Sequence, residues 1–257
     1  RRVSTRNTVT CSRLFTTAMD NSLRTAYLQA MGIQSWVRRG LQEEVVTPEP
    51  EAGHVAPPAR AGFSIDSLDW PELESCVAAC SGCDLHETRT STVFGTGNRQ
   101  ADWMIIGEAP GADEDRQGEP FVGRAGQLLT EMLRAAGFQR QDVFITNILK
   151  CRPPQNRDPR PEEVASCHAY LQRQVALVRP SLILAVGRIA AHNLLETDAP
   201  VSRLRGRIHH YGEDRIPLVV TYHPAYLLRS PLEKRKAWED LRLALQVSGA
   251  GQRESAS

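Results

Sequence analysis

The stretch Trp103-Met104-Ile105-Ile106-Gly107-Glu108-Ala109-Pro110-Gly111 decides the fold class. Four consecutive apolar residues are typical of a strand buried on both faces, and the glycine- and proline-containing run after them ends that strand in a polar turn. The same pairing of apolar run and polar turn recurs three times along the chain. We therefore predict buried strands at Trp103–Ile106, Val143–Ile148, Leu182–Val186 and Leu218–Thr221.

Helical patterns fill the intervals between these strands, at Gly126–Ala136, Pro161–Val178 and Ile189–Leu195. Strands that alternate with helices indicate βαβ units and a parallel sheet covered on both faces. We predict an α/β fold: a three-layer αβα domain around a central, mainly parallel four-stranded sheet. In such sheets ligands bind beyond the carboxyl ends of the strands, so the four turns should form one functional rim.

The chain divides into five predicted segments. Residues 1–20 form an extension, residues 21–40 an amphipathic helix, residues 41–67 a flexible linker, residues 68–247 the main domain and residues 248–257 a disordered tail. The chain starts without Met, and residues 1–18 are rich in Arg, Ser and Thr and contain no acidic residue. An organellar transit peptide has this composition, but we favour an upstream extension with Met19 as the natural start.

Composition excludes some classes of protein. The 257 residues carry a net charge of +1, and they include neither a run long enough to cross a membrane nor the apolar core of a secretory signal. We expect a cytoplasmic protein, in the bacterial cytosol and associated with the nucleoid. Lys and Arg outnumber Asp and Glu between Thr146 and Arg242, which suits either a nucleic-acid partner or a solubilising surface.

The cysteine spacing predicts a metal site. Cys80 and Cys83 are separated by two residues, a spacing that lets two thiolates face one metal, and Cys151 and Cys167 lie farther along the chain. Four thiolates suit zinc and an iron–sulfur cluster equally, and spacing alone does not separate them. Cys76 is a rival ligand because it lies one helical turn before Cys80, whereas Cys11 falls in the N-terminal extension.

Several motifs, in order, resemble those of family-four uracil-DNA glycosylases, the iron–sulfur members of the uracil-DNA glycosylase superfamily. The resemblance rests on Gly107–Asp115, Gly118–Gly126, Thr146–Pro154 with Asn156-Arg157, His223–Arg229 and the four cysteines, and it covers roughly Leu73 to Leu245. It implies a uracil-DNA glycosylase-like fold and a 4Fe–4S cluster held by Cys80, Cys83, Cys151 and Cys167. It also implies action on uracil-containing DNA.

The resemblance assigns four residues to substrate binding. Phe121 would stack on the extruded base, since every base offers a π-face. Asn147 would read uracil through its amide, which offers a donor to O4 and an acceptor to N3–H. Gly107 would let the backbone approach the ligand closely, and the small Ala109 would leave room at the sugar.

The resemblance assigns catalysis to His223, Glu108, Glu114 and Asn156. His223 would donate a hydrogen bond to uracil O2, where negative charge develops. Some relatives place an aspartate at the position of Ala109, so the water must be held here by another group. Glu108, Glu114 and the amide of Asn156 remain alternatives, and we favour Glu114.

DNA contacts are expected from the segment after His223. Leu227 and Leu228 would wedge the minor groove, and Arg229 would contact a phosphate, as would Arg152 and Arg157. We also expect a monomer, with the N-terminal segment available to a replication or repair protein.

The predicted function is monofunctional hydrolysis of the N-glycosidic bond of uracil in DNA, which leaves an abasic site for base excision repair. Two alternatives remain: a non-catalytic DNA-binding module that uses the cluster as scaffold, and a zinc-containing nucleotide hydrolase.

Overall fold

The computed structural model describes residues 64–249. The predicted extension, the helix at 21–40, most of the 41–67 linker and most of the tail lie outside the described residues. The end of the predicted linker contains one turn of 3₁₀ helix, η1 (Ile65–Ser67). The predicted main domain, residues 68–247, lies wholly within the described part.

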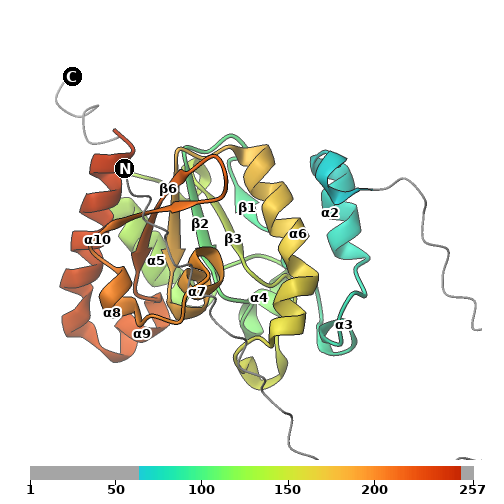
Figure 1. Ribbon diagram of the computed structural model, residues 1–257. Helices are drawn as coiled ribbons and strands as arrows, with labels where there is room; N and C mark the ends of the chain where they lie inside the picture. Colours follow the sequence, from blue (N-terminus) through green and yellow to red (C-terminus); the bar gives the residue numbers. More distant parts are fainter. Residues whose placement is uncertain (1–63, 250–257) are drawn as a thin grey trace, which may run out of the picture. The chain divides into compact units, whose positions relative to one another are not determined.

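A six-stranded sheet forms the centre of the domain (Figure 1). Its order is β1 (Thr96–Gly97), β3 (Phe144–Asn147), β2 (Trp103–Gly107), β4 (Leu182–Val186), β6 (Ile216–Thr221) and β5 (Ile208–Tyr211). The four inner strands are parallel, as predicted. The count of four is corrected to six, because β1 and β5 add antiparallel edges. A strand of two residues, such as β1, has no periodicity to detect.

Helices cover both faces of the sheet and complete the predicted three-layer fold. α5 (Arg124–Ala135) and α10 (Lys234–Val247) pack on one face, and α6 (Pro161–Val178) and α7 (Arg188–Leu195) on the other. In Figure 1 α10 and α6 lie on opposite sides of the sheet. The shorter helices are α2 (Trp70–Ala78), α3 (Leu85–Thr88), α4 (Ala112–Gln117), α8 (Val201–Leu204), α9 (Pro224–Arg229), η2 (Arg140–Asp142), η3 (Pro154–Asn156) and η4 (Pro231–Glu233).

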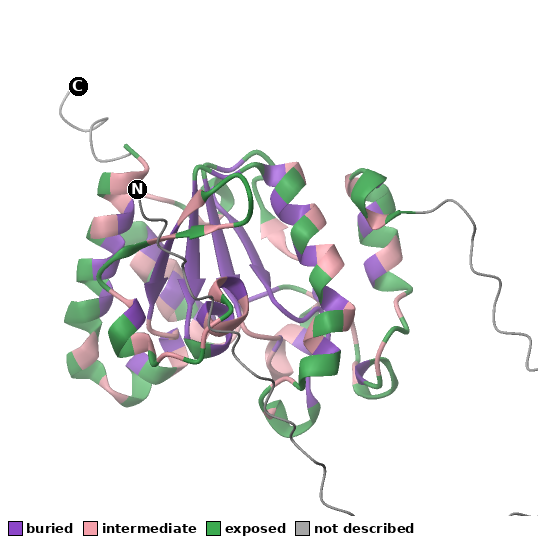
Figure 2. Ribbon diagram, viewed as in Figure 1, coloured by how far each residue is buried: buried purple, intermediate pink, exposed green. Residues whose placement is uncertain are grey.

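Strand β2 shows why the inner strands are uniformly apolar. Successive side chains point to opposite faces, so Ile105 packs with α5 and α10 while Met104 and Ile106 pack with α6 and α7. All five residues of β2 are buried (Figure 2). Each buried aliphatic side chain contributes about 1.5–3 kcal/mol relative to an exposed one. The inner strands therefore form a rigid support for the turns at their carboxyl ends.

Helix α2 brings the first cysteines to the domain. Asp69 caps its N-terminus, and Glu72 closes a capping box by accepting the Asp69 N–H at 3.0 Å. The ring of Trp70 packs against Phe144 of β3, with ring centroids 5.3 Å apart. These contacts anchor α2 beside the sheet and fix the segment that follows it.

None of the helices in residues 64–249 combines the length and the apolar character that crossing a membrane requires.

Candidate active site

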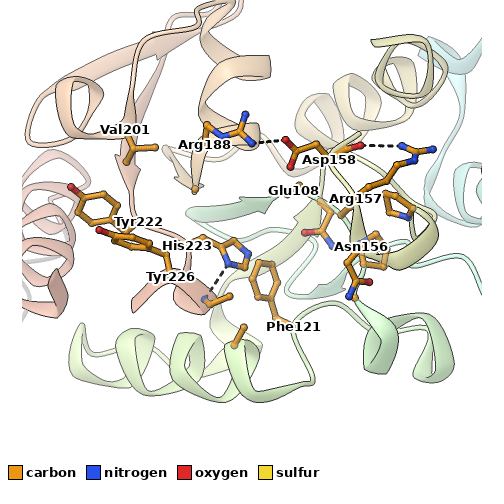
Figure 3. A pocket seen from close by; sticks show the side chains of 18 of the residues that line it. Glu108, Phe121, Asn156, Arg157, Asp158, Arg188, Val201, Tyr222, His223 and Tyr226 are labelled. Atoms are coloured by element: carbon orange, nitrogen blue, oxygen red, sulfur yellow. Dashed lines mark hydrogen bonds and ion pairs between the residues drawn. The ribbon is translucent and has the colours of Figure 1, made fainter. Parts of the chain in front are cut away.

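A pocket of about 820 Å³ opens at the carboxyl ends of the inner strands, where the sequence predicted a functional rim. The turns after β2, β3, β4 and β6 all contribute to its wall. Among the predicted site residues the pocket is lined by Glu108, Ala109, Glu114, Phe121, Asn147, Asn156, His223 and Arg229. Figure 3 shows this pocket with Phe121 facing His223.

Phe121 is held in an unusual backbone conformation. Its φ angle is +55°, in the left-handed region that non-glycine residues rarely adopt. Gly126 of α5 makes this possible, because a Cβ there would overlap the carbonyl oxygen of Phe121. Gly107 faces the ring itself: a Cβ there would stand 2.5 Å from Cζ of Phe121. The two glycines thus leave space for the backbone and the ring of Phe121. Strained backbone conformations of this kind are typical of functional sites.

Asn147 ends β3 with its side chain inside the pocket wall. It is only 2% exposed, and its Oδ1 has no hydrogen-bond partner among the described residues. A buried acceptor without a donor costs about 1–3 kcal/mol. Its backbone is fixed from behind, because Nζ of the buried Lys150 donates to the carbonyl oxygen of Asn147 at 2.8 Å. The site therefore presents a rigid, unsatisfied acceptor to a ligand N–H.

His223 presents a hydrogen-bond donor. Its Nδ1 accepts the backbone N–H of Ala225 at 3.1 Å, so the neutral ring must carry its proton on Nε2. Burial, reinforced by the positive charge of Arg229, lowers the pKa of His223 to about 4. The imidazole is therefore neutral at physiological pH. Its centroid lies 5.7 Å from that of Phe121.

Comparison with known proteins identifies the family of this chain. The family model described as the Uracil DNA glycosylase superfamily matches residues 94–242. The chain belongs to this superfamily. The Type-4 uracil-DNA glycosylase of Archaeoglobus fulgidus is 44% identical over 195 residues, which cover 73% of this chain and 96% of that protein. Those of Pyrobaculum aerophilum and Thermotoga maritima are 43% and 44% identical over 68% and 60% of this chain, and over 92% and 80% of their own lengths.

The two carboxylates of this glycosylase pocket differ in their surroundings. Oε1 of Glu114 accepts the N–H groups of Val122 and Gly123, both at 3.0 Å, and so holds the loop that carries Phe121. Glu108 is half-buried, and burial, with a smaller effect from Asp158, raises its pKa above the ordinary 4.5. Glu114 is thus engaged by the protein itself, and Glu108 is better suited to interact with a water molecule.

Asn156, the third candidate for holding water, lies on the exposed rim of the pocket. Its Oδ1 accepts Nε of Arg152 at 2.8 Å. Its backbone has a φ angle of +54°, and it belongs to the short turn η3 after Cys151. The amide therefore shares its oxygen with an arginine and keeps only its nitrogen as a free donor toward the pocket.

Four cysteines gather beside the pocket, and each sulfur receives an N–H. Cys83, Cys151 and Cys167 pack in one cluster with Leu85 and Leu149. Cys80 is close enough to raise the pKa of both Cys83 and Cys151 electrostatically. The donors are the backbone of Gly82 to Cys80 at 3.4 Å, the backbone of Leu85 to Cys83, Nη1 of Arg89 to Cys151 at 3.0 Å and the backbone of Lys150 to Cys167.

Two observations refine the cysteine prediction. Cys76 packs in a different apolar cluster, with Leu73 and Val77, which contains none of the other four cysteines. Within residues 64–249 no three His, Cys, Asp or Glu side chains are placed to hold a single metal ion. A four-iron cluster is wider than one ion, and its thiolate ligands therefore stand farther apart. Cys11 lies outside the described residues.

The segment after His223 corrects one predicted DNA contact. Leu227 is 0% exposed and faces the same hollow as Ala237 and Leu241 of α10, so it lies on the buried side of α9 and cannot wedge DNA in this conformation. Its neighbour Leu228 is 37% exposed, and Leu232 in η4, which the sequence analysis did not select, is 92% exposed. Helical spacing explains the difference, since consecutive residues of α9 point in different directions.

Of the three arginines predicted to contact phosphates, two are bound by other side chains of the described residues and one is not. Arg157 is bound by Glu163, a buried carboxylate, at 2.5 and 2.9 Å, which ties the loop after Cys151 to α6. Arg152 is held by Asn156. Arg229 is exposed and lines the pocket, and no acidic side chain within residues 64–249 forms an ion pair with it.

Arg188, Asp158, Tyr222 and Tyr226 are among the pocket-wall residues that the sequence analysis did not select. Arg188, after β4, pairs with Asp158 at 2.6 Å across the mouth (Figure 3). Tyr222 and Tyr226 flank His223, with ring centroids 5.0 Å apart. The position of Arg188 in the turn after a predicted strand was an available signal, as was the proximity of both tyrosines to His223.

Proposed function

We propose that this protein is a monofunctional uracil-DNA glycosylase that extrudes uracil from DNA and hydrolyses its N-glycosidic bond. The observation that carries the proposal is the unsatisfied Oδ1 of Asn147, buried beside Phe121 in the pocket that a neutral His223 also lines. The names of the Type-4 relatives support the same activity.

Recognition follows from the donors and acceptors on offer. Uracil carries a hydrogen on N3, which can donate to Oδ1 of Asn147, and O4 can accept from the amide nitrogen. Cytosine has no hydrogen on N3 and carries an amino group at position 4, so it would oppose both contacts. With cytosine in the pocket, the buried Oδ1 would stay unpaired, so the site should discriminate strongly between uracil and cytosine. The ring of Phe121 supplies the stacking face.

Bond cleavage places negative charge on the base and positive charge on the sugar. As the bond between C1′ and N1 breaks, its electron pair passes to the uracil ring, and Nε2–H of His223 can donate to O2, where charge accumulates. A neutral donor held in place by Ala225 needs no reorganisation during the reaction. A water molecule then adds to C1′, and its proton passes to solvent or to the departing base.

Glu108 is the group that we propose to orient this water and to offset the sugar's charge. Its carboxylate lines the pocket, and no hydrogen bond from another described side chain engages it. Glu114 instead acts through Phe121, by holding the loop at residues 121–123. Ala109 leaves space for the sugar beside these groups.

DNA binding would use the exposed end of the segment after His223. Leu228 and Leu232 present apolar side chains that could fill the gap left by the extruded base. Arg229 would contact a phosphate, so binding should weaken as salt concentration rises.

The four cysteines Cys80, Cys83, Cys151 and Cys167 fit the ligand set of a 4Fe–4S cluster. The fit rests on four soft sulfur donors in one place, each with an N–H directed at it, the kind of hydrogen bonding found around iron–sulfur sites. When bound, the cluster would supply a structural cross-link between three distant segments, and no redox step is assigned to it. The monomeric state, the cytosolic location and a protein partner for the N-terminal segment stay predictions.

An assay on DNA tests the proposal. A labelled oligonucleotide with one uracil, incubated with the purified protein and treated with alkali, should break at the uracil, and the same strand with cytosine should remain intact. Asn147→Asp should reduce excision strongly, because a carboxylate cannot donate to O4. Retained DNA binding without breakage at uracil would instead support the non-catalytic alternative.

A further inference from the structure

The pocket is larger than one base requires. Its volume of about 820 Å³ lies near the upper end of the range for drug-sized ligands, about 300–1,000 Å³, and uracil is smaller than such ligands. Phe121, Asn147 and His223 account for the contacts of a single pyrimidine. The wall on the other side of His223 has no role in that recognition, and in Figure 3 it consists of Tyr222 and Tyr226.

The two tyrosines form a tilted pair of rings that lines the pocket. Their ring centroids are 5.0 Å apart and their planes are inclined by 37°. Tyr226 is 36% exposed, although it neighbours the fully buried Leu227 on α9. An aromatic ring that served only to fill the core would be buried, so the exposure of Tyr226 requires another explanation.

The pair is fixed from behind. The guanidinium of Arg205 lies 5.9 Å from the centre of the Tyr222 ring, within the range of a cation–π contact. Arg205 is held in turn by the buried carboxylate of Asp240 and by the carbonyl oxygen of Lys236, at 3.0 and 2.7 Å. The ring of Tyr222 is thus held between Arg205 and Tyr226, and it supports the Tyr226 ring from behind.

We propose that the exposed ring of Tyr226, supported from behind by Tyr222, forms a second stacking platform, which binds the nucleobase next to the extruded uracil on the same strand. The proposal deepens the proposed function and rests on it. Tyr226 lies beside His223, so a base on its ring would be adjacent to the uracil that His223 contacts. Stacking on an aromatic face tolerates any base, which suits an enzyme that must act on uracil in every sequence context.

The test combines protein and DNA changes in a double-mutant cycle. The probe is a single-stranded oligonucleotide with one 2′-fluorinated deoxyuridine, whose glycosidic bond resists cleavage, and binding is followed by fluorescence anisotropy. Tyr226→Ala should weaken binding about five- to 100-fold, the effect of losing one base–aromatic stack. Tyr226→Phe, which keeps the ring, should stay within about threefold of the original protein.

The DNA arm identifies the ligand. Replacing the base on the 5′ or the 3′ side of the uracil by an abasic spacer should weaken binding by the original protein, on one side only, by a similar factor. On that DNA Tyr226→Ala should cause no additional loss. A loss that persists undiminished with both neighbours abasic would overturn the proposal, as would unchanged binding by a folded Tyr226→Ala protein.

Uracil excision is scored separately with cleavable DNA. Absence of excision by the original protein would refute the glycosylase activity, and the binding cycle would still report on the platform. Normal excision without coupling in the cycle would refute the platform alone.

Discussion

Glycine at position 107 decides whether the base pocket can form. A Cβ on this residue would overlap Oδ1 of Asn147 and approach Cζ of Phe121 to 2.5 Å, so both groups would have to move. We expect Gly107→Ala to reduce the rate of uracil excision about 100-fold, the penalty that a displacement of about 1 Å imposes on a reacting geometry. Single-turnover excision assays would measure this effect.

The fold should tolerate the same substitution, since the other residues of β2 keep their packing on both faces. The thermal unfolding midpoint and the iron content of Gly107→Ala therefore serve as controls. Excision at the original rate by this variant would show that the close approach of Phe121 and Asn147 is not needed.

Glu108 should determine how excision responds to acid. Burial raises the pKa of its carboxyl above 4.5, and the charged form predominates only above that pKa. Excision should therefore be maintained at neutral pH and fall as the pH drops through a value above 4.5. His223, with its pKa lowered to about 4, stays neutral throughout this interval and cannot cause the fall.

The variant Glu108→Gln separates these two groups. It should be slower by about 10²- to 10⁴-fold, the range for a residue that assists proton transfer. It should also lack the acid fall until His223 gains a proton near pH 4. The measurement is the pH profile of kcat/KM, and an unchanged profile in Glu108→Gln would assign the acid fall to another group.

At the scale of elements, the loop between α4 and α5 depends on one carboxylate. Glu114 belongs to α4, yet its Oε1 accepts the N–H groups of Val122 and Gly123. Glu114→Ala should remove both bonds and loosen the Phe121 ring, with a rise in KM of at least about tenfold. Glu114→Gln keeps an oxygen acceptor and should behave nearly like the original protein.

This pair of variants tests the role that the sequence favoured for Glu114. If Glu114 orients water through its charge, Glu114→Gln should lower kcat as much as Glu114→Ala does. Steady-state kinetics on a uracil oligonucleotide give both constants. A large fall in kcat for Glu114→Gln would return the water-orienting role to Glu114.

The elements that the sequence predicted are those with a strong local pattern. The four inner strands are apolar along their length, and α6 shows helical periodicity over 18 residues after a proline at its start. Helix α10 is also amphipathic, but it has no signal for a helix start. It begins with Lys234-Arg235-Lys236, positive charges placed at the end of a helix that disfavours them. It is stabilised instead by packing of Leu241 and Ala244 and by the pairing of Asp240 with Arg205.

The site shows the same division. Asn147 and His223 were assigned through the family resemblance, and the direction of the strands that precede them explains why both lie at one rim. The burial of Leu227 and the engagement of Glu114 by the 121–123 loop depend on contacts between elements that no local pattern encodes. The same is true of the tyrosine pair, whose openness to the pocket follows from the orientation of α9.

At the scale of the whole molecule, the sheet and the cysteine group are separate sources of stability. The two large apolar clusters that pack the sheet contain no cysteine. The thiols instead join the segment after α2, the loop after β3 and the first turns of α6. Loss of the cluster should therefore loosen one side of the domain without dissolving its core.

Removal of iron tests this separation. Chelation under reducing conditions should leave the far-UV circular dichroism spectrum largely unchanged, because the sheet and its covering helices persist. Excision should nevertheless fall steeply, since Cys151 follows Asn147 by only four positions and the rim between them would lose its anchor. Complete loss of secondary structure on chelation would show that the sheet cannot form without the cluster.

Cysteine substitutions give the same test with a matched control. Cys151→Ser should lose iron and excision. Its unfolding midpoint should fall by roughly 10 °C, because in a domain of this size each kcal/mol of lost stability lowers the midpoint by about 2–4 °C. Cys76→Ser should keep all three properties, since Cys76 packs with Leu73 and Val77 in a cluster that contains none of the other four cysteines. If Cys76→Ser loses iron and Cys80→Ser retains it, the roles of these two residues are exchanged. The cross-link would then begin on α2 rather than after it.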